Sequence, residues 1–154
     1  MWSAISPTCM MGRHRSVYPI GMSLGYDIYE DIGLLYIRGQ GEITQHQRMT
    51  AMLAWLREPK YEDCRDALID LAGVKTTPKI AELRELIAML KQQMPARGPR
   101  RLAMVTPKPI TFIVARMFEH LVRSHGLPFE VKVFMTLGRA WDWLRPDGPP
   151  FHVR

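Results

Sequence analysis

The chain has 154 residues and a mass of 17.8 kDa, which fits one domain of ordinary size and excludes a two-domain enzyme. Hydrophobic residues make up 47% and charged residues 23%, as in globular proteins, so disordered, collagen-like and disulfide-scaffold classes are excluded. The net charge is +6, and the excess lies in residues 71–154, which hold fourteen basic and six acidic residues.

The chain has two cysteines, Cys9 and Cys64, which is too few for a disulfide framework, although one disulfide between them is conceivable. We expect reduced thiols and a cytoplasmic protein. No window reaches the run of about 18 apolar residues that a membrane span needs, and the first part of the chain lacks the apolar segment of a signal peptide. The sequence therefore predicts no transmembrane segment and no secretion.

Proline and glycine without sustained periodicity predict a flexible N-terminal tail over residues 1–24. Because the patterned part of the chain begins only after Met22, that methionine offers an alternative start, as do Met10 and Met11. We expect one domain over residues 25–145. The segment 146–154 contains three prolines and is predicted to be a loose C-terminal tail.

The patterned part opens with two short runs that are rich in β-branched and aromatic residues, 26–30 and 34–38. Asp31 and Gly33 lie between the runs and suit a hairpin turn. Thr44 then offers an N-cap, and the apolar spacing that follows predicts a helix ended by Pro59. The expected order is hairpin, then helix.

Two apolar runs without alternation, 67–71 and 102–105, predict central strands that are buried on both faces, and residues 131–134 predict the last strand. Amphipathic stretches separate these strands, the first beginning near Pro78, and Thr136 is expected to cap a short final helix. This alternation predicts an α/β fold with a mainly parallel five-stranded sheet, an antiparallel N-terminal hairpin and about four helices.

Three segments carry a family resemblance: ALIDLAGVKTTP at residues 67–78, RLAMVTP at 101–107 and VKVFMTLGRAWDWL at 131–144. With the leading hairpin, they resemble the STAS domain, in particular the SpoIIAA-like branch of bacterial proteins related to anti-sigma-factor antagonists. The resemblance spans residues 24–145. It implies the SpoIIAA-like (STAS) fold and a non-enzymatic regulatory module that binds a protein partner or associates with itself.

The family's switches carry a phosphorylated serine where the second helix opens, whereas this chain reads KTTPK at residues 75–79. The resemblance therefore implies a partner-binding or phospho-switch site at Thr76, Thr77, Lys79 and Ile80. A phosphate on either threonine would lie at a helix N-terminus, where the helix dipole favours negative charge. The alternative is that Thr76 or Thr77 is simply the N-cap of the helix.

The SpoIIAA-like branch also looks like the lipid-carrying CRAL-TRIO domains in topology, which implies an alternative function as a carrier or sensor of a small apolar or anionic lipid ligand. Eleven methionines suit a soft apolar pocket, but they fill protein cores equally well. The candidate anion-binding residues are Lys91, Arg97, Arg100, Arg101 and Lys108. A solvated basic loop is the alternative, and the absence of aromatic residues between Lys91 and Lys108 predicts no nucleic-acid binding.

No motif predicts catalysis, a metal or a cofactor. The glycines at residues 39–41 lack the third glycine of a dinucleotide fingerprint, and the histidines have no metal-ligand spacing. Cys64 has no histidine beside it that would act as a base. We therefore expect a protein that is not an enzyme and needs no cofactor or metal. The remaining alternative is an enzyme whose cleft gathers Asp70, Thr106 and His120.

Overall fold

The computed structural model describes residues 14–17 and 23–145. The strands of this part are β1 (His14–Val17), β2 (Leu24–Tyr29), β3 (Leu34–Gly41), β4 (Asp66–Val74), β5 (Arg101–Val105) and β6 (Glu130–Phe134). Its α-helices are α1 (Gln45–Leu56), α2 (Ile80–Gln93), α3 (Pro109–Ser124) and α4 (Leu137–Leu144), and short 3-10 turns lie at Glu30–Ile32 and Tyr61–Asp63.

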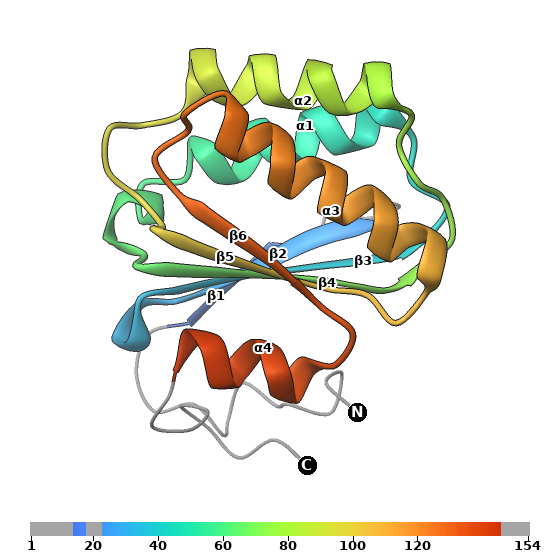
Figure 1. Ribbon diagram of the computed structural model, residues 1–154. Coiled ribbons are helices and arrows are strands. Elements are labelled where there is room, and N and C mark those ends of the chain that lie inside the picture. Colours follow the sequence, from blue (N-terminus) through green and yellow to red (C-terminus); the bar gives the residue numbers. More distant parts are fainter. Residues whose placement is uncertain (1–13, 18–22, 146–154) are drawn as a thin grey trace.

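The strands form one sheet in the order β1-β2-β3-β4-β5-β6, with helices on both faces (Figure 1). We call the side that α1, α2 and α3 cover the helical face, and the side that α4 covers the α4 face. The predicted α/β fold, with an antiparallel N-terminal hairpin and a parallel remainder, is confirmed. The sheet has one strand more than the five predicted, because β1 joins its edge.

The extra strand lies in the segment that the sequence assigns to a flexible tail. Residues 14–17 pair antiparallel with β2, with His14 opposite Tyr29 and Val17 opposite Tyr26. The run HRSV has no apolar alternation, so nothing local marks it as a strand, and only the open edge of β2 gives its backbone a partner. The other residues of the predicted tails, 1–13, 18–22 and 146–154, lie outside the described residues.

The parallel half of the sheet matches the sequence prediction closely. β4 lies between β3 and β5, and Ala67 on β4 is opposite Leu102 on β5. Leu68 and Ala103 are completely buried, as expected for strands with helices on both sides. β6 continues the parallel order, with Leu102 opposite Val131.

Local capping by a threonine side chain explains where α1 and α4 begin. The Thr44 hydroxyl accepts a hydrogen bond from the Gln47 backbone N–H at 3.1 Å, so Thr44 is the predicted N-cap of α1. Thr136 similarly accepts from Arg139 at the start of α4. For α2, however, the N-cap position is Lys79, so the alternative in which Thr76 or Thr77 caps this helix is wrong.

Two apolar cores lie on opposite sides of the sheet. The larger core joins the helical face to α1, α2 and α3 through side chains such as Trp55, Ile87 and Phe118. The smaller core lies under α4 and includes Leu68 and Trp141. In the described ranges, no helix has the length and apolar character needed to cross a membrane.

Candidate functional site

A pocket of about 120 Å³ lies on the helical face, between the sheet and the three helices α1, α2 and α3. Most of its lining is apolar and includes Ile37, Met52, Ile69, Leu83, Met104 and Phe118. The loop after β4 adds Thr76 and Pro78 to the lining. The pocket therefore lies near the carboxyl ends of parallel strands, where ligands commonly bind in α/β proteins.

Arg48 is the charged residue in this lining, and the threonines Thr76 and Thr111 add hydroxyl groups. The half-buried Arg48 guanidinium donates to Gln45 Oε1 at 3.2 Å and to Thr76 Oγ1 at 3.5 Å. Burial lowers the pKa of Arg48, and the nearby Glu82 carboxylate opposes this shift. The arginine remains a cation, so it places a positive charge at the wall of an apolar pocket.

Thr76 joins two loops rather than capping a helix. Its hydroxyl accepts from the Ile43 backbone N–H at 2.9 Å and donates to the Ile43 carbonyl oxygen at 3.0 Å. The Lys75 N–H donates in addition to the Gly41 carbonyl oxygen at 2.8 Å. These bonds hold the loop after β3 against the loop after β4, and they fix the pocket end where Arg48 lies.

We call the two hydrogen bonds between Thr76 and Ile43 the clip. The other members of the predicted phospho-switch site lie beside this clip. Thr77 is half-buried, and Lys79 is exposed with its backbone N–H donating to Glu82 Oε1 at 2.8 Å. Ile80 begins α2 and is 42% exposed. The structure thus brings the four predicted residues to one end of α2, but Thr76 alone among them lines the pocket.

The predicted anion-binding residues do not form one cluster. Lys91 lies in the last turn of α2, and Arg97 and Arg100 are exposed near the start of β5. Lys108 follows the opposite end of β5, where its Nζ donates to the Val74 carbonyl oxygen at 2.8 Å. Arg101 makes its hydrogen bonds to the end of α4, on the opposite side of the sheet. The basic loop that looks continuous in sequence is therefore divided between the two ends of a strand.

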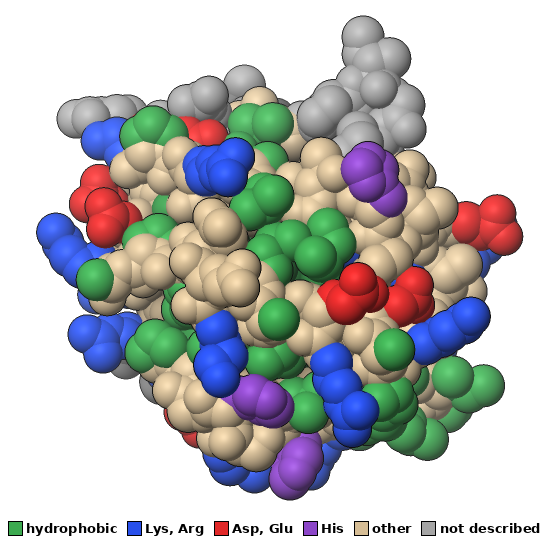
Figure 2. All heavy atoms as spheres, turned by 90° about the horizontal axis from the view of Figure 1, so that it is seen from above, with side chains coloured by type: hydrophobic (Ala, Val, Ile, Leu, Met, Phe, Trp, Pro, Cys, Tyr) green, Lys and Arg blue, Asp and Glu red, His purple; other side chains and the backbone are tan. Residues whose placement is uncertain are grey.

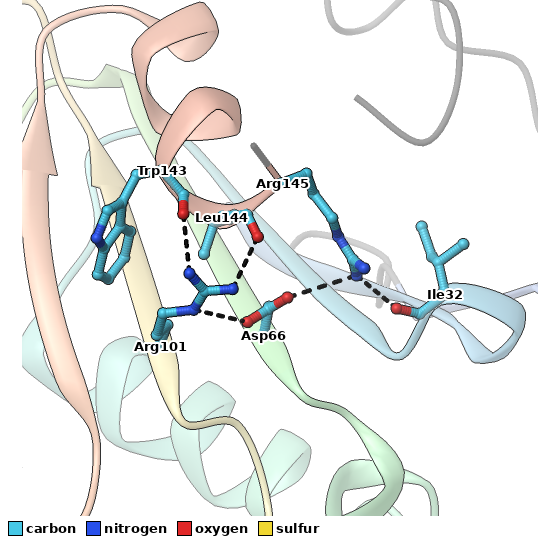
Figure 3. Close-up of polar contacts among 6 residues, drawn as sticks. All are labelled: Ile32, Asp66, Arg101, Trp143, Leu144 and Arg145. Atoms are coloured by element: carbon cyan, nitrogen blue, oxygen red, sulfur yellow. Dashed lines mark hydrogen bonds and ion pairs between the residues drawn. The ribbon is translucent and has the colours of Figure 1, made fainter. Parts of the chain in front are cut away.

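Arg101 anchors α4 on the opposite side of the sheet (Figure 3). Its Nη1 and Nη2 donate to the carbonyl oxygens of Trp143 and Leu144 at 2.9 and 2.8 Å, and its Nε lies 3.4 Å from Asp66 Oδ1. Arg145 Nη2 approaches Asp66 Oδ2 at 3.5 Å and also donates to the Ile32 carbonyl oxygen. We call Asp66, Arg101 and Arg145 the α4 anchor.

The α4 anchor satisfies groups that would otherwise be costly to bury. Asp66 is only 4% exposed, so its carboxylate needs the two cations that face it. Burial lowers the pKa of Arg145, and Asp66 opposes that shift. Arg101 also caps the last carbonyl groups of α4, where a positive charge is favourable. Its guanidinium therefore has a structural partner for each of its nitrogen atoms.

Sequence reasoning missed Arg48, although a signal for it exists. Arg48, Met52 and Trp55 are spaced by four and three residues along α1, so they share one helical face. The apolar members of that face predict the helix, and the cation that precedes them adds nothing to that prediction. A basic residue on the buried stripe of an amphipathic helix is a sign of a polar contact inside the protein.

The alternative of an enzymatic cleft finds no support in the pocket. Asp70, Thr106 and His120 do not line it. Thr106 is completely buried, and the Asp70 carboxylate accepts from the backbone N–H of Ala72. In the described part of the chain, no group of at least three histidine, cysteine, aspartate or glutamate side chains is arranged to hold a metal ion.

A family model agrees with the fold described above. The model of the SpoIIAA-like family matches residues 34–145, which is most of the chain. No curated protein matches. One similar solved structure is an uncharacterised protein with a SpoIIAA-like fold from Shewanella loihica, with 21% sequence identity, a TM-score of 0.48, and coverage of 87% of this chain and 97% of that chain. On the family match, this chain belongs to the SpoIIAA-like family.

Proposed function

We propose that this protein is a non-enzymatic regulatory module that binds a protein partner at the end of the molecule where α2 and α3 begin. Membership of the SpoIIAA-like family suggests a regulatory protein-interaction module, and this fold is generally non-enzymatic. A cytoplasmic location is part of the proposal. The free thiol of buried Cys64 supports a reducing compartment.

One observation carries the docking surface: three large apolar side chains are exposed on the first turns of these helices. Ile80 is 42% exposed on α2, while Ile110 and Ile113 are 70% and 60% exposed on α3. Ile110 and Ile113 are three residues apart and share a helical face. The view onto the helical face shows hydrophobic side chains exposed among basic ones (Figure 2).

The two helix starts belong to one surface because they border the same pocket. Pro78 and Leu83 line it from the α2 side, and Thr111 and Val114 line it from the α3 side. Lys79 and Lys108 are exposed beside the isoleucines. An apolar centre with a basic rim suits a partner that offers apolar side chains surrounded by carboxylates.

The test uses the double variant Ile110→Gln/Ile113→Gln as bait in cross-linking and co-purification from the source cells. We expect the variant to lose the partner or the self-associated dimer that the wild-type protein retains. The matched control is Met135→Gln, because Met135 is 53% exposed between β6 and α4 rather than on α2 or α3. Equal recovery of the partner with wild type and double variant would refute this docking surface.

A second function is favoured by the pocket itself: the module binds a small, mainly apolar ligand on the helical face. The supporting observation is an apolar cavity of about 120 Å³ with Arg48 among its lining residues. Native mass spectrometry of the purified protein tests this function, with Ala115→Phe as a variant that fills the pocket. A bound mass that persists in Ala115→Phe would place the ligand elsewhere.

A phospho-switch at the β4–α2 loop is the regulatory part of the proposal. A phosphate on Thr76 would replace the hydroxyl hydrogen that Ile43 accepts, and so would separate the two loops at the pocket end. Thr77 lacks those bonds, and its phosphorylation would leave the clip intact. Phosphopeptide mapping of protein from the source cells distinguishes the two threonines, and an unmodified loop under all growth conditions contradicts the switch.

A further inference from the structure

The charge of Arg48 is offset only in part by the protein around it, through the nearby Glu82 carboxylate. In the described ranges, no carboxylate forms an ion pair with its guanidinium, and both of its hydrogen-bond acceptors are neutral oxygens. A guanidinium carries more N–H donors than these two bonds use. A half-buried cation with unused donors, on a residue that lines a cavity, is suited to receive an anionic group from a ligand.

Thr76, which accepts one of these two hydrogen bonds, cannot take the place of an anionic partner for Arg48. Its hydroxyl already donates to the Ile43 carbonyl oxygen and accepts from the Ile43 N–H. Its contact with Arg48 is long, at 3.5 Å, whereas strong bonds from a guanidinium to an anion are shorter, at about 2.7–2.9 Å. An anionic ligand would therefore compete with a weak neutral contact rather than with an ion pair.

The size of the cavity limits the apolar part of the ligand. An engineered apolar cavity of about 150 Å³ holds one benzene molecule. The pocket here has about 120 Å³, so it has room for a single ring or a short branched chain. A long acyl chain would need several times this volume, which counts against the lipid ligand that the CRAL-TRIO resemblance implies.

We propose that the pocket binds a small monocarboxylic acid, with its ring or short branched chain among the apolar residues and its carboxylate on Arg48. This inference rests on the proposed ligand-binding function and names its ligand class. A carboxylate is favoured over a phosphate because a planar, two-oxygen group matches one guanidinium in a bidentate manner. A phosphate dianion would leave charge uncompensated, since Arg48 is the one cation that lines the pocket among the residues the structure describes.

The experiment compares phenylacetate with its neutral isostere phenylacetamide by titration of the ¹⁵N-labelled protein. The readout is the indole N–H signal of Trp55, which lines the pocket. We expect the acid to bind about tenfold more tightly than the amide, or better, because hydrogen bonds between two charged groups are stronger than those between a charged and a neutral group. Arg48→Met should reduce the affinity for the acid to that for the amide.

Two control variants separate the effect of the Arg48 charge on binding from an effect on folding. Arg84→Met removes an exposed arginine from α2, outside the pocket lining, and should leave both affinities unchanged. Arg48→Lys keeps the charge without the planar fork and should retain part of the preference for the acid. If Arg48→Met fails to fold, as judged by thermal unfolding, the comparison of wild type with Arg48→Lys still tests the inference.

The outcomes distinguish this inference from the function on which it rests. Equal affinity for acid and amide would overturn the role of Arg48 while leaving ligand binding in place. Tighter binding of palmitate than of phenylacetate at the Trp55 signal would overturn the size limit and favour a lipid ligand. No response of Trp55 to any of the three compounds, together with no co-purified ligand, would overturn the ligand-binding function itself.

Discussion

Arg101 on β5 and Asp66 on β4 form an ion pair that also fastens the end of α4 to the sheet. One guanidinium reaches the Asp66 carboxylate at 3.4 Å and the carbonyl oxygens of Trp143 and Leu144 at 2.9 and 2.8 Å. Asp66 and Arg101 are direct neighbours in the parallel register of the two strands. The sheet register and the position of the last helix are thereby linked through one side chain.

Arg101→Met should destabilise the protein by about 1.5–3 kcal/mol, because charge-assisted hydrogen bonds are lost and the buried Asp66 keeps only Arg145. Urea unfolding at neutral pH measures this loss. The matched control is Arg100→Met, since Arg100 is exposed and outside the α4 anchor. Similar unfolding midpoints for the two variants would show that the anchor contributes little to stability.

Gly39→Ala should destabilise the protein by about 1–3 kcal/mol through overpacking. An added Cβ would lie 2.7 Å from Val74 Cγ2 and 2.9 Å from Ile43 Cδ1, and both of those residues line the pocket. Thermal unfolding measures the effect. The control is Gly138→Ala in α4, where a Cβ meets nothing within 4 Å and higher helix propensity should add stability. A stabilised Gly39→Ala protein would contradict the close packing of the strand end.

Thr76→Val should cost about 1–3 kcal/mol, because it leaves the N–H and carbonyl groups of Ile43 without their shared partner. Thr77→Val makes the same change one residue away, without loss of that clip, and should alter stability by no more than about 0.5 kcal/mol. Chemical denaturation of both variants gives the comparison. Equal stability of the two would mean that the clip adds nothing to the fold.

Stability should fall steeply in alkaline solution because of a buried pair, Cys64 and Tyr61. Burial raises the pKa of Cys64 from 9.0 to about 12, and it raises the pKa of Tyr61 from 10.0 to about 12. The unfolded chain releases these protons at lower pH than the folded one. The stabilising effect is therefore complete below the unfolded values and is lost as the pH rises towards 12.

Cys64→Ala removes one of these two groups and should flatten the decline of unfolding free energy with pH. Each group contributes a slope of at most about 1.4 kcal/mol per pH unit. Urea unfolding of wild type and variant at several alkaline pH values measures the difference. Identical slopes would indicate that folding does not raise the pKa of the Cys64 thiol.

Much of the fold could be predicted because its signals are local. The apolar runs at residues 67–71 and 102–105 have the length and composition of buried strands, and the structure pairs them in parallel. Thr44 and Thr136 cap the helices that directly follow them. In each case, the residues that decide the structure are neighbours in sequence, so periodicity and capping preferences suffice.

The candidate site could be predicted only in part, because its contacts join distant residues. Thr76 bonds with Ile43 across 33 residues, which turned an expected helix cap into a clip between loops. Arg48 lines the pocket only because α1 packs beside the loop after β4. For such residues, the sequence supplies the chemical group but not its neighbours.

By itself, the sequence determined the layered α/β fold and the family, since the alternation of apolar runs with amphipathic helices is encoded over short stretches. Only the tertiary structure decided that β1 completes the sheet, that Arg101 anchors α4 across 43 residues instead of joining a basic cluster, and that Arg48 lines an apolar cavity. The physical reason is that burial and hydrogen-bond partners are set by packing between elements, and packing brings together residues that no sequence window contains.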